Sequence, residues 1–278
     1  MNNHQYYFMI QQLTLFSDFF MYEVFSRSKP AITLLARILT GKPDLVVKRW
    51  GMEVKKGLPF FRHVRYDLFV EDMEGNLYNF EIENGRRALG QRALFNLSVL
   101  VSHMLKPNEP FRALNESWVV FLARKDFLKQ NEPFYTYEWF DRKWKRILHT
   151  KAHIRFVNGE YRGDDAIGKL MHDFHCTNPD DMFYDELREA VSYFKKEPEG
   201  VNAMCEIMRE FERKSKNEGR REGRAEGRAK GRAEGRAQER ESIMRNLREE
   251  GMSYEKIARI TNQSLSQVRS FFKMKQPA

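Results

Sequence analysis

The feature that most constrains the fold is a pair of alternating segments, residues 64–70 and 77–83, joined by a short polar turn. In both segments the apolar side chains have even numbers: Val64, Tyr66, Leu68 and Val70, then Tyr78, Phe80 and Ile82. The residues between them, 72–76, read DMEGN and supply turn chemistry. If facing residues sum to about 148, the two apolar faces coincide. The pattern predicts a β-hairpin with one apolar face and one odd-numbered polar face.

The flanking segments predict what the hairpin packs against. Residues 17–40 indicate two helices, and residues 46–54 indicate a loosely patterned strand. Residues 87–105 indicate a helix stopped by Pro107, and residues 118–122 form an apolar run typical of a strand covered on both faces. The order of helices, strand, hairpin, helix and strand predicts an α/β fold with a mixed sheet flanked by helices.

The hairpin register places three acids together. Asp67 lies on the odd face of the first strand, and Glu81 and Glu83 lie on the odd face of the second. Facing β-carbons in a hairpin are about 5 Å apart, and carboxylates held this close repel unless a cation lies between them. A hard divalent cation is one candidate. The alternative is a solvated outer face on which Arg65 neutralises Glu83 across the strands.

The sequence resembles a known family, the PD-(D/E)XK nuclease family transposases, also called the Rpn or recombination-promoting nuclease family. The resemblance covers most of the chain and rests on these runs: SDFFMYEVF, RYDLFVEDMEGNLYNFEIEN, GQRALFN, SWVVFLARKDF, FVNGEYRGDD, IGKLMHDFHC and the Glu-Gly-Arg tail. It implies a restriction-endonuclease-like αβββαβ core. It also implies a Mg²⁺-dependent DNA endonuclease that hydrolyses phosphodiester bonds, associated with recombination or mobile elements.

The resemblance also implies roles for single residues. Asp67 and Glu81 would bind Mg²⁺ or Mn²⁺, and Glu83 would stand at the third catalytic position. Gln91 and Arg92 would contact the phosphate from the start of the following helix; their alternative is an ordinary surface turn. Two positions depart from the superfamily pattern: Tyr66 precedes the Asp in place of Pro, and Glu83 stands in place of Lys. A catalytically degenerate fold that binds DNA or partner proteins is therefore the alternative function.

The composition changes sharply after the first 212 residues. Residues 1–212 resemble a globular nuclease domain, and residues 213–240 form a linker of Glu-Gly-Arg repeats. The repeat has a period of four, so that on a helix each residue type would meet its own kind at i+4 and gain no ion pairs. Each glycine costs a helix about 1 kcal/mol relative to alanine. A flexible charged tether is the preferred prediction, and a helix with a glycine face is the alternative.

The last segment, residues 241–278, predicts a small helical module. Ser253 can cap one helix, and Ser264 with Gln267 fits a capping box at the start of another. The run EGMSYEKIARITNQSLSQVRSFF looks like a helix-turn-helix, whose last helix would present to DNA the side chains of Ser266, Gln267 and Arg269. A helical docking or dimerisation tail is the alternative, and a homodimer stays open.

Two further clusters are weaker candidates. The run HDFHC at 172–176 suggests zinc, but the spacing is short and no second ligand pair follows at zinc-finger distance, so a partly buried helix end is preferred. Residues 141–155, DRKWKRILHTKAHIR, form a basic cluster around Trp144. This cluster predicts either contact with a phosphate backbone or an ordinary solvated face.

Composition limits the partners and the compartment. The chain has two cysteines and neither a signal-peptide pattern nor an apolar run long enough to cross a membrane, so a cytoplasmic protein without a membrane partner is expected. The formal net charge of +9 weakly favours a polyanion such as DNA. No phosphate-binding glycine loop is present, so no small-molecule cofactor beyond the metal is expected.

Overall fold

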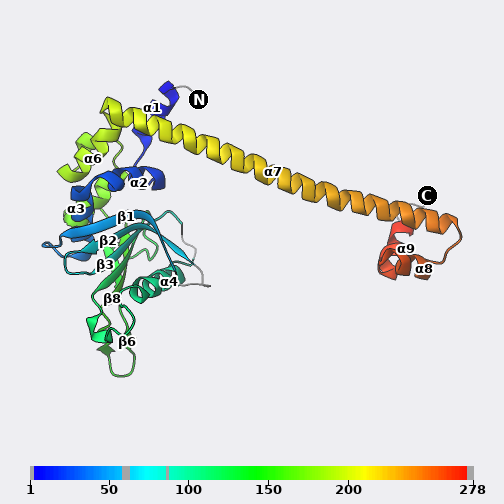
Figure 1. The fold of residues 1–278 in the computed structure, drawn as a ribbon, viewed down its shortest axis with the longest axis horizontal. Coiled ribbons are helices and arrows are strands. Elements are labelled where there is room, and N and C mark those ends of the chain that lie inside the picture. The colour runs from blue at the N-terminus through cyan, green and yellow to red at the C-terminus, as the bar shows by residue number, and fades with distance from the viewer. Residues whose placement is uncertain (1–2, 58–62, 86–87, 274–278) are drawn as a thin grey trace. The chain divides into compact units, whose positions relative to one another are not determined.

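The structure is a computed structural model that describes residues 3–57, 63–85 and 88–273. It contains two compact units, Met1–Met208 and Arg209–Ala278. The boundary between them lies close to the predicted domain end at 212. The first unit holds the sheet and the second is helical (Figure 1).

The first unit is built on a six-stranded mixed sheet in the order β1-β2-β3-β4-β8-β5. The antiparallel neighbours are β1 with β2, β2 with β3, and β5 with β8, whereas β3, β4 and β8 run parallel. β6 and β7 form a separate two-stranded hairpin. The strands are β1 (Val47–Lys56), β2 (Val64–Asp72), β3 (Leu77–Glu83), β4 (Ser117–Ala123), β5 (Phe134–Tyr137), β6 (Phe140–Asp141), β7 (Arg146–Ile147) and β8 (Ala152–Asn158).

Helices cover both faces of the sheet, which confirms the predicted α/β class (Figure 1). One core packs against α1 (Asn3–Gln12), α2 (Asp18–Arg27), α3 (Lys29–Thr40), α5 (Ala166–His175) and α6 (Asp185–Lys195). The second core packs against α4 (Leu89–Ser102). Two single 3₁₀ turns span Phe111–Ala113 and Pro179–Asp181. None of the described helices is both long and apolar enough to cross a membrane.

The predicted hairpin register is confirmed near the turn. Leu68 lies opposite Phe80 and Val70 lies opposite Tyr78, so each pair of numbers sums to 148. These four side chains share the larger core. The turn forms as expected, because the Asp72 carboxylate accepts hydrogen bonds from two turn amides and Gly75 adopts φ +81°.

The expectation that Val64 and Tyr66 share this face is wrong, because both side chains lie in the α4 core. The β2–β3 ladder ends at the Leu68–Phe80 pair. On the other side of β2, Glu53 adopts a left-handed conformation with φ +51° between the Met52–Leu68 and Val54–Tyr66 pairs. The side-chain alternation of β2 therefore changes face next to Asp67.

The remaining sequence expectations for the first unit largely hold. Residues 17–40 form α2 and α3, with Ser28 capping α3 and Gly41 ending it at φ +72°. All of β4 is buried, as predicted. The helix predicted for 87–105 is α4, which ends at Ser102; Arg87 lies outside the described residues.

A buried lysine joins α6 to the N-terminal segment. Lys195 is 1% exposed, and its Nζ donates to the carbonyl oxygens of Gln11, Leu13 and Thr177 at 2.5–3.1 Å. Burial lowers the Lys195 pKa to about 8, whereas three carbonyl acceptors favour the charged form. Nothing in the sequence pattern marked this residue.

The repeat is helical, so the preferred prediction of a flexible tether is wrong. α7 (Pro198–Glu249) runs without a break through the Glu-Gly-Arg segment. Arginine, alanine and glutamate are good helix formers and offset the cost of the glycines. Arginine side chains at 232, 236 and 240 also donate to the carbonyl oxygens four residues earlier. Built β-carbons on the repeat glycines, Gly219 to Gly235, meet no described atom within 4 Å.

After α7 the chain is helical, and the predicted caps form. Ser253 caps α8 (Tyr254–Thr261) by accepting from the Lys256 amide. Ser264 and Gln267 form the capping box of α9 (Leu265–Lys273), because each side chain accepts from the other residue's amide. A small core joins the end of α7 to both helices through Met244, Ile257, Ala258 and Val268.

Candidate functional site

Two carboxylates meet where β2 and β3 separate. Asp67 Oδ2 accepts a hydrogen bond from the Ile82 amide at 3.1 Å, just beyond the last ladder pair. Glu81 is 4% exposed, and its Oε1 accepts from Asn79 Nδ2 at 2.9 Å. Because the β2–β3 ladder has ended, the Asp67 side chain takes the place of a backbone acceptor. The two acids therefore lie close together on neighbouring strands, although the ladder does not pair them as the register predicted.

Burial and mutual repulsion disfavour the charged forms of this pair. Burial, together with the neighbouring Asp67 carboxylate, raises the pKa of Glu81 to about 8. Burial also raises the pKa of Asp67 to about 6, although the Ile82 amide works in the opposite direction. Two acids in this state retain protons at pH values where exposed carboxyls have lost them. A bound cation would relieve the same repulsion.

The third acid has a different environment. Glu83 Oε1 accepts from the Gly85 amide at 2.7 Å, and Glu83 Oε2 accepts from Arg92 Nη1 in a short contact. The Arg92 Nη2 atom lies 3.7 Å from Glu81 Oε2. The guanidinium thus sits between Glu83 and Glu81 and faces the Phe121 ring at 5.4 Å. Arg92, which was expected to contact a phosphate, therefore pairs with two of the acids in this structure.

The alternative of a solvated acidic face is wrong. Glu81 and Glu83 are 4% and 8% exposed because α4 covers this side of the sheet. The cross-strand partner expected for Glu83 is wrong too, since Arg65 pairs with Glu53 at 3.2 Å. Gln91 is exposed in the first turn of α4, beside Arg92.

The Asp67–Glu81 pair fits Mg²⁺ better than the three acids together do. Mg²⁺ binds in proteins through one or two carboxylates and keeps its other positions for water and phosphate oxygens. Asn79 Oδ1, beside Glu81, is a buried oxygen for which the described residues provide no hydrogen-bond donor. Sequence reasoning missed Asn79, although its position two residues before Glu81 puts it on the same strand face. Both oxygens of Glu83 are already occupied.

The HDFHC segment forms the only His/Cys/Asp/Glu group of three or more that lies close enough to share an ion within the described ranges. Ligand atoms of His172, Asp173 and Cys176 lie within 4.8 Å of one another. However, the Asp173 carboxylate accepts from the amides of Phe183 and Tyr184 at 2.8 and 2.9 Å. Burial raises the pKa of the Cys176 thiol to about 11, which disfavours the thiolate that binds metals. These contacts agree with the predicted partly buried helix end.

The predicted DNA-reading residues are all exposed at the start of α9. Gln267 is held in the capping box with Ser264, and Ser266 Oγ lies 2.9 Å from Ser264 Oγ. Arg269 pairs with Glu255 of α8 at 3.2 Å. Each residue therefore has a partner that stabilises the α8–turn–α9 arrangement.

Comparisons with known proteins identify no relative. No family model matches the chain, and neither a curated protein nor a solved structure matches it. The nuclease resemblance therefore stays a prediction that rests on the residues quoted above.

Proposed function

We propose that this chain is a Mg²⁺-dependent DNA endonuclease, with Mn²⁺ as a substitute ion. The observation that carries the proposal is the buried pair of Asp67 and Glu81. These carboxylates come from two strands and meet where the strands separate, and burial disfavours the charge on each. Perturbed acids of this kind concentrate at functional sites.

The arrangement of elements supports the same proposal. In chain order α3, β1, β2, β3, α4 and β4 give helix, three strands, helix and strand. This is the αβββαβ order that the family resemblance implies. Asp67 and Glu81 lie on the second and third strands of that series, and the helix that follows supplies Arg92.

The chain's own residues would divide the work as follows. Asp67 and Glu81 would hold the ion, and the Ile82 amide orients Asp67 by its hydrogen bond. A bound Mg²⁺ would supply positive charge to the scissile phosphate and lower the pKa of a water molecule. Glu83 holds Arg92 at the edge of the site.

Arg92 is the candidate phosphate ligand. Its side chain is 45% exposed although it contacts two buried acids. Once an ion neutralises Glu81, the weaker 3.7 Å contact of Arg92 would no longer be needed, and the guanidinium could turn to a phosphate oxygen. Gln91, in the same exposed helical turn, would add a second contact.

Plasmid nicking tests the proposal. The wild-type chain should nick supercoiled DNA with Mg²⁺ or Mn²⁺ and lose the activity in EDTA. Asp67→Asn and Glu81→Gln, which keep size and remove charge, should each reduce nicking at least a hundredfold. Asp44→Asn, at an exposed position, is the matched control and should nick normally. Undiminished nicking by Asp67→Asn would remove the site assignment.

A second candidate is a degenerate nuclease fold that binds DNA or a partner protein. The ion pairs of Arg92 with Glu83 and Glu81 favour it, because a resident guanidinium already neutralises part of the acidic charge. Glu83 also provides no ammonium to stabilise a transition state. Calorimetric titration with Mg²⁺ and Mn²⁺ separates the two candidates. DNA binding with neither metal affinity nor nicking would favour the accessory function.

A further inference from the structure

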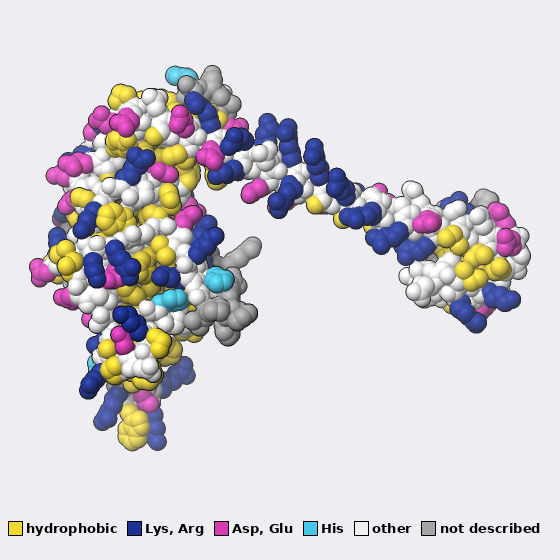
Figure 2. Space-filling model, in the orientation of Figure 1, with side chains coloured by type: hydrophobic (Ala, Val, Ile, Leu, Met, Phe, Trp, Pro, Cys, Tyr) yellow, Lys and Arg dark blue, Asp and Glu magenta, His cyan; other side chains and the backbone are white. Residues whose placement is uncertain are grey.

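A short hairpin carries exposed aromatic and basic side chains that no core explains. It comprises β6, β7 and their connection, and we refer to residues 139–149 as the basic–aromatic hairpin. Trp144 is 66% exposed and Phe140 is 51% exposed. Figure 2 shows hydrophobic and basic side chains gathered on this projection, whose position Figure 1 marks by β6. Neither ring belongs to any of the cores formed by the described residues.

The net positive charge of the hairpin favours an anionic partner. Its cations are Arg142, Lys143, Lys145 and Arg146, all exposed. Its one acid, Asp141, is used internally, because Asp141 Oδ1 accepts from the Trp144 amide at 2.6 Å. The hairpin thus presents an excess of positive charge.

The cations and the rings are interleaved. Lys143 Nζ lies 5.0 Å from the centre of the Trp144 ring, and Lys145 Nζ lies 5.7 Å from the centre of the Phe140 ring. Each of these two rings therefore has an ammonium group beside it. Proteins that bind single-stranded nucleic acid combine these two features, since bases stack on the rings while cations contact the phosphates.

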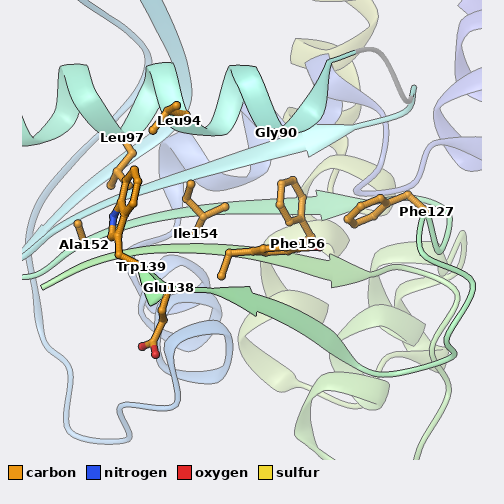
Figure 3. Close-up of a pocket in the computed structure, with 10 residues that line it drawn as sticks. Gly90, Leu94, Leu97, Phe127, Glu138, Trp139, Ala152, Ile154 and Phe156 are labelled. Carbon is orange, nitrogen blue, oxygen red and sulfur yellow. The ribbon is translucent and has the colours of Figure 1, made fainter. Parts of the chain in front are cut away.

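An aromatic groove continues from the base of the hairpin. A hollow of about 340 Å³ runs between α4 and the sheet, and its wall includes Phe127, Tyr137, Trp139 and Phe156. Trp139 lies against Leu97 of α4 in Figure 3, and Phe127 lies near the opposite end. The groove therefore extends along the α4 side of the sheet, the side that also holds Glu81 and Glu83.

The parallel strands give the distance from hairpin to acids. Glu83 is in register with Ala123 of β4, which is in register with Asn158 at the end of β8. The hairpin enters β8 at its other end, Ala152. Along the strand direction, these residues are about 20 Å apart.

We propose that the basic–aromatic hairpin and the groove at its base bind a single-stranded stretch of DNA. Unpaired bases would stack on Trp144 and in the aromatic groove, while Arg142 and Lys143 contact the backbone. This inference rests on the proposed nuclease function and extends it. It assigns to the nuclease a substrate with unpaired bases a few nucleotides from the cleaved bond. Duplex DNA would not fit the stacking surfaces, because its bases are already stacked.

The test uses the full chain in EDTA, so that no cleavage occurs. Fluorescence anisotropy would measure binding to a labelled oligo(dT) of about 15 nucleotides and to a duplex of equal length. Trp144→Ala should weaken oligo(dT) binding roughly 5- to 100-fold and leave duplex binding nearly unchanged. The double variant Arg142→Ala/Lys143→Ala should lower the slope of log affinity against log salt by about 0.7 for each phosphate that it no longer neutralises.

Controls separate this site from the rest of the chain. Phe111→Ala, at an aromatic ring 85% exposed outside the hairpin, should bind like wild type. Photocross-linking with iodouridine-substituted oligo(dT) should label Trp144, which distinguishes the hairpin from any DNA contact made by α7 or α9. Binding is measured without metal and nicking is scored separately with Mg²⁺, so a failure of the metal centre would not be mistaken for a failure of the hairpin.

Three outcomes would overturn the inference. One is unchanged oligo(dT) binding by Trp144→Ala, and another is an equal loss for oligo(dT) and duplex, which would indicate general charge attraction. The third is Trp144-dependent binding to phosphatidylserine–phosphatidylcholine vesicles without any effect on oligo(dT), which would assign the hairpin to a membrane surface.

Discussion

The substitution Glu81→Gln should stabilise the metal-free protein at high pH. The Glu81 carboxylate is buried beside Asp67, and its pKa is raised to about 8. A folded-state pKa above the unfolded value means that the folded chain binds more protons, so the free energy of unfolding falls as pH rises from about 4.5 to 8. Glutamine keeps the acceptor for Asn79 Nδ2 and carries no charge, so this loss should disappear.

The magnitude follows from the same pKa. Each pH unit between the unfolded and folded values is worth about 1.4 kcal/mol, which sets an upper limit near 5 kcal/mol. Removal of the 3.7 Å ion pair with Arg92 offsets part of the gain. We expect Glu81→Gln to be more stable than wild type by about 2–4 kcal/mol at pH 8.5 and nearly equal to it at pH 4.5.

Urea unfolding in EDTA, followed by tryptophan fluorescence, measures this difference. All four tryptophans lie before residue 209, so the signal reports the first unit alone. Glu83→Gln is the matched control, because Glu83 is paired with Arg92 and should show no gain at high pH. A Glu81→Gln protein no more stable than wild type at pH 8.5 would refute the view that Glu81 carries an unrelieved buried charge.

Three further predictions concern the metal, the core and the repeat. The affinity for Mn²⁺ should fall as pH drops from 8 to 6, because the ion must displace protons held by Asp67 and Glu81. Calorimetry in buffers of different ionisation enthalpy would detect the released protons. An affinity that does not depend on pH would contradict the site. Lys195→Met should lower the free energy of unfolding, measured in urea, by roughly 3 kcal/mol or more, because three buried carbonyls lose their donor. A change under 1 kcal/mol would be inconsistent with this role. Gly227→Ala with Gly231→Ala should stabilise α7 by about 0.5–1 kcal/mol per site. The melting temperature of the circular dichroism signal at 222 nm should rise accordingly. An unchanged melting temperature would support the interpretation of the repeat as a flexible tether.

The sequence predicted those parts of the fold that depend on local chemistry. The hairpin register followed from residue parity and the turn at Gly75, and the capping box followed from the spacing of Ser264 and Gln267. Asp67 and Glu81 lie close together as expected, but through the contact of Asp67 with the Ile82 amide beyond the ladder and not through a ladder pair.

What the sequence did not predict depends on contacts between distant segments. The sequence left a solvated acidic face open as an alternative, because no local pattern says that α4 packs over it. The change of face beside Asp67 arises where Glu53, on a neighbouring strand, adopts positive φ. Lys195 could not be assigned a role, because its three acceptors come from segments remote in the chain.

The most direct test of the metal centre is a crystal structure of the full chain grown with Mn²⁺, with the ion located by its anomalous signal. We expect a single strong peak between the carboxylates of Asp67 and Glu81, with the Arg92 guanidinium displaced from Glu81 and still held by Glu83. A peak only at His172 and Cys176, or no peak while Arg92 keeps its contact with Glu81, would contradict the proposal and leave the chain as a non-catalytic binding protein.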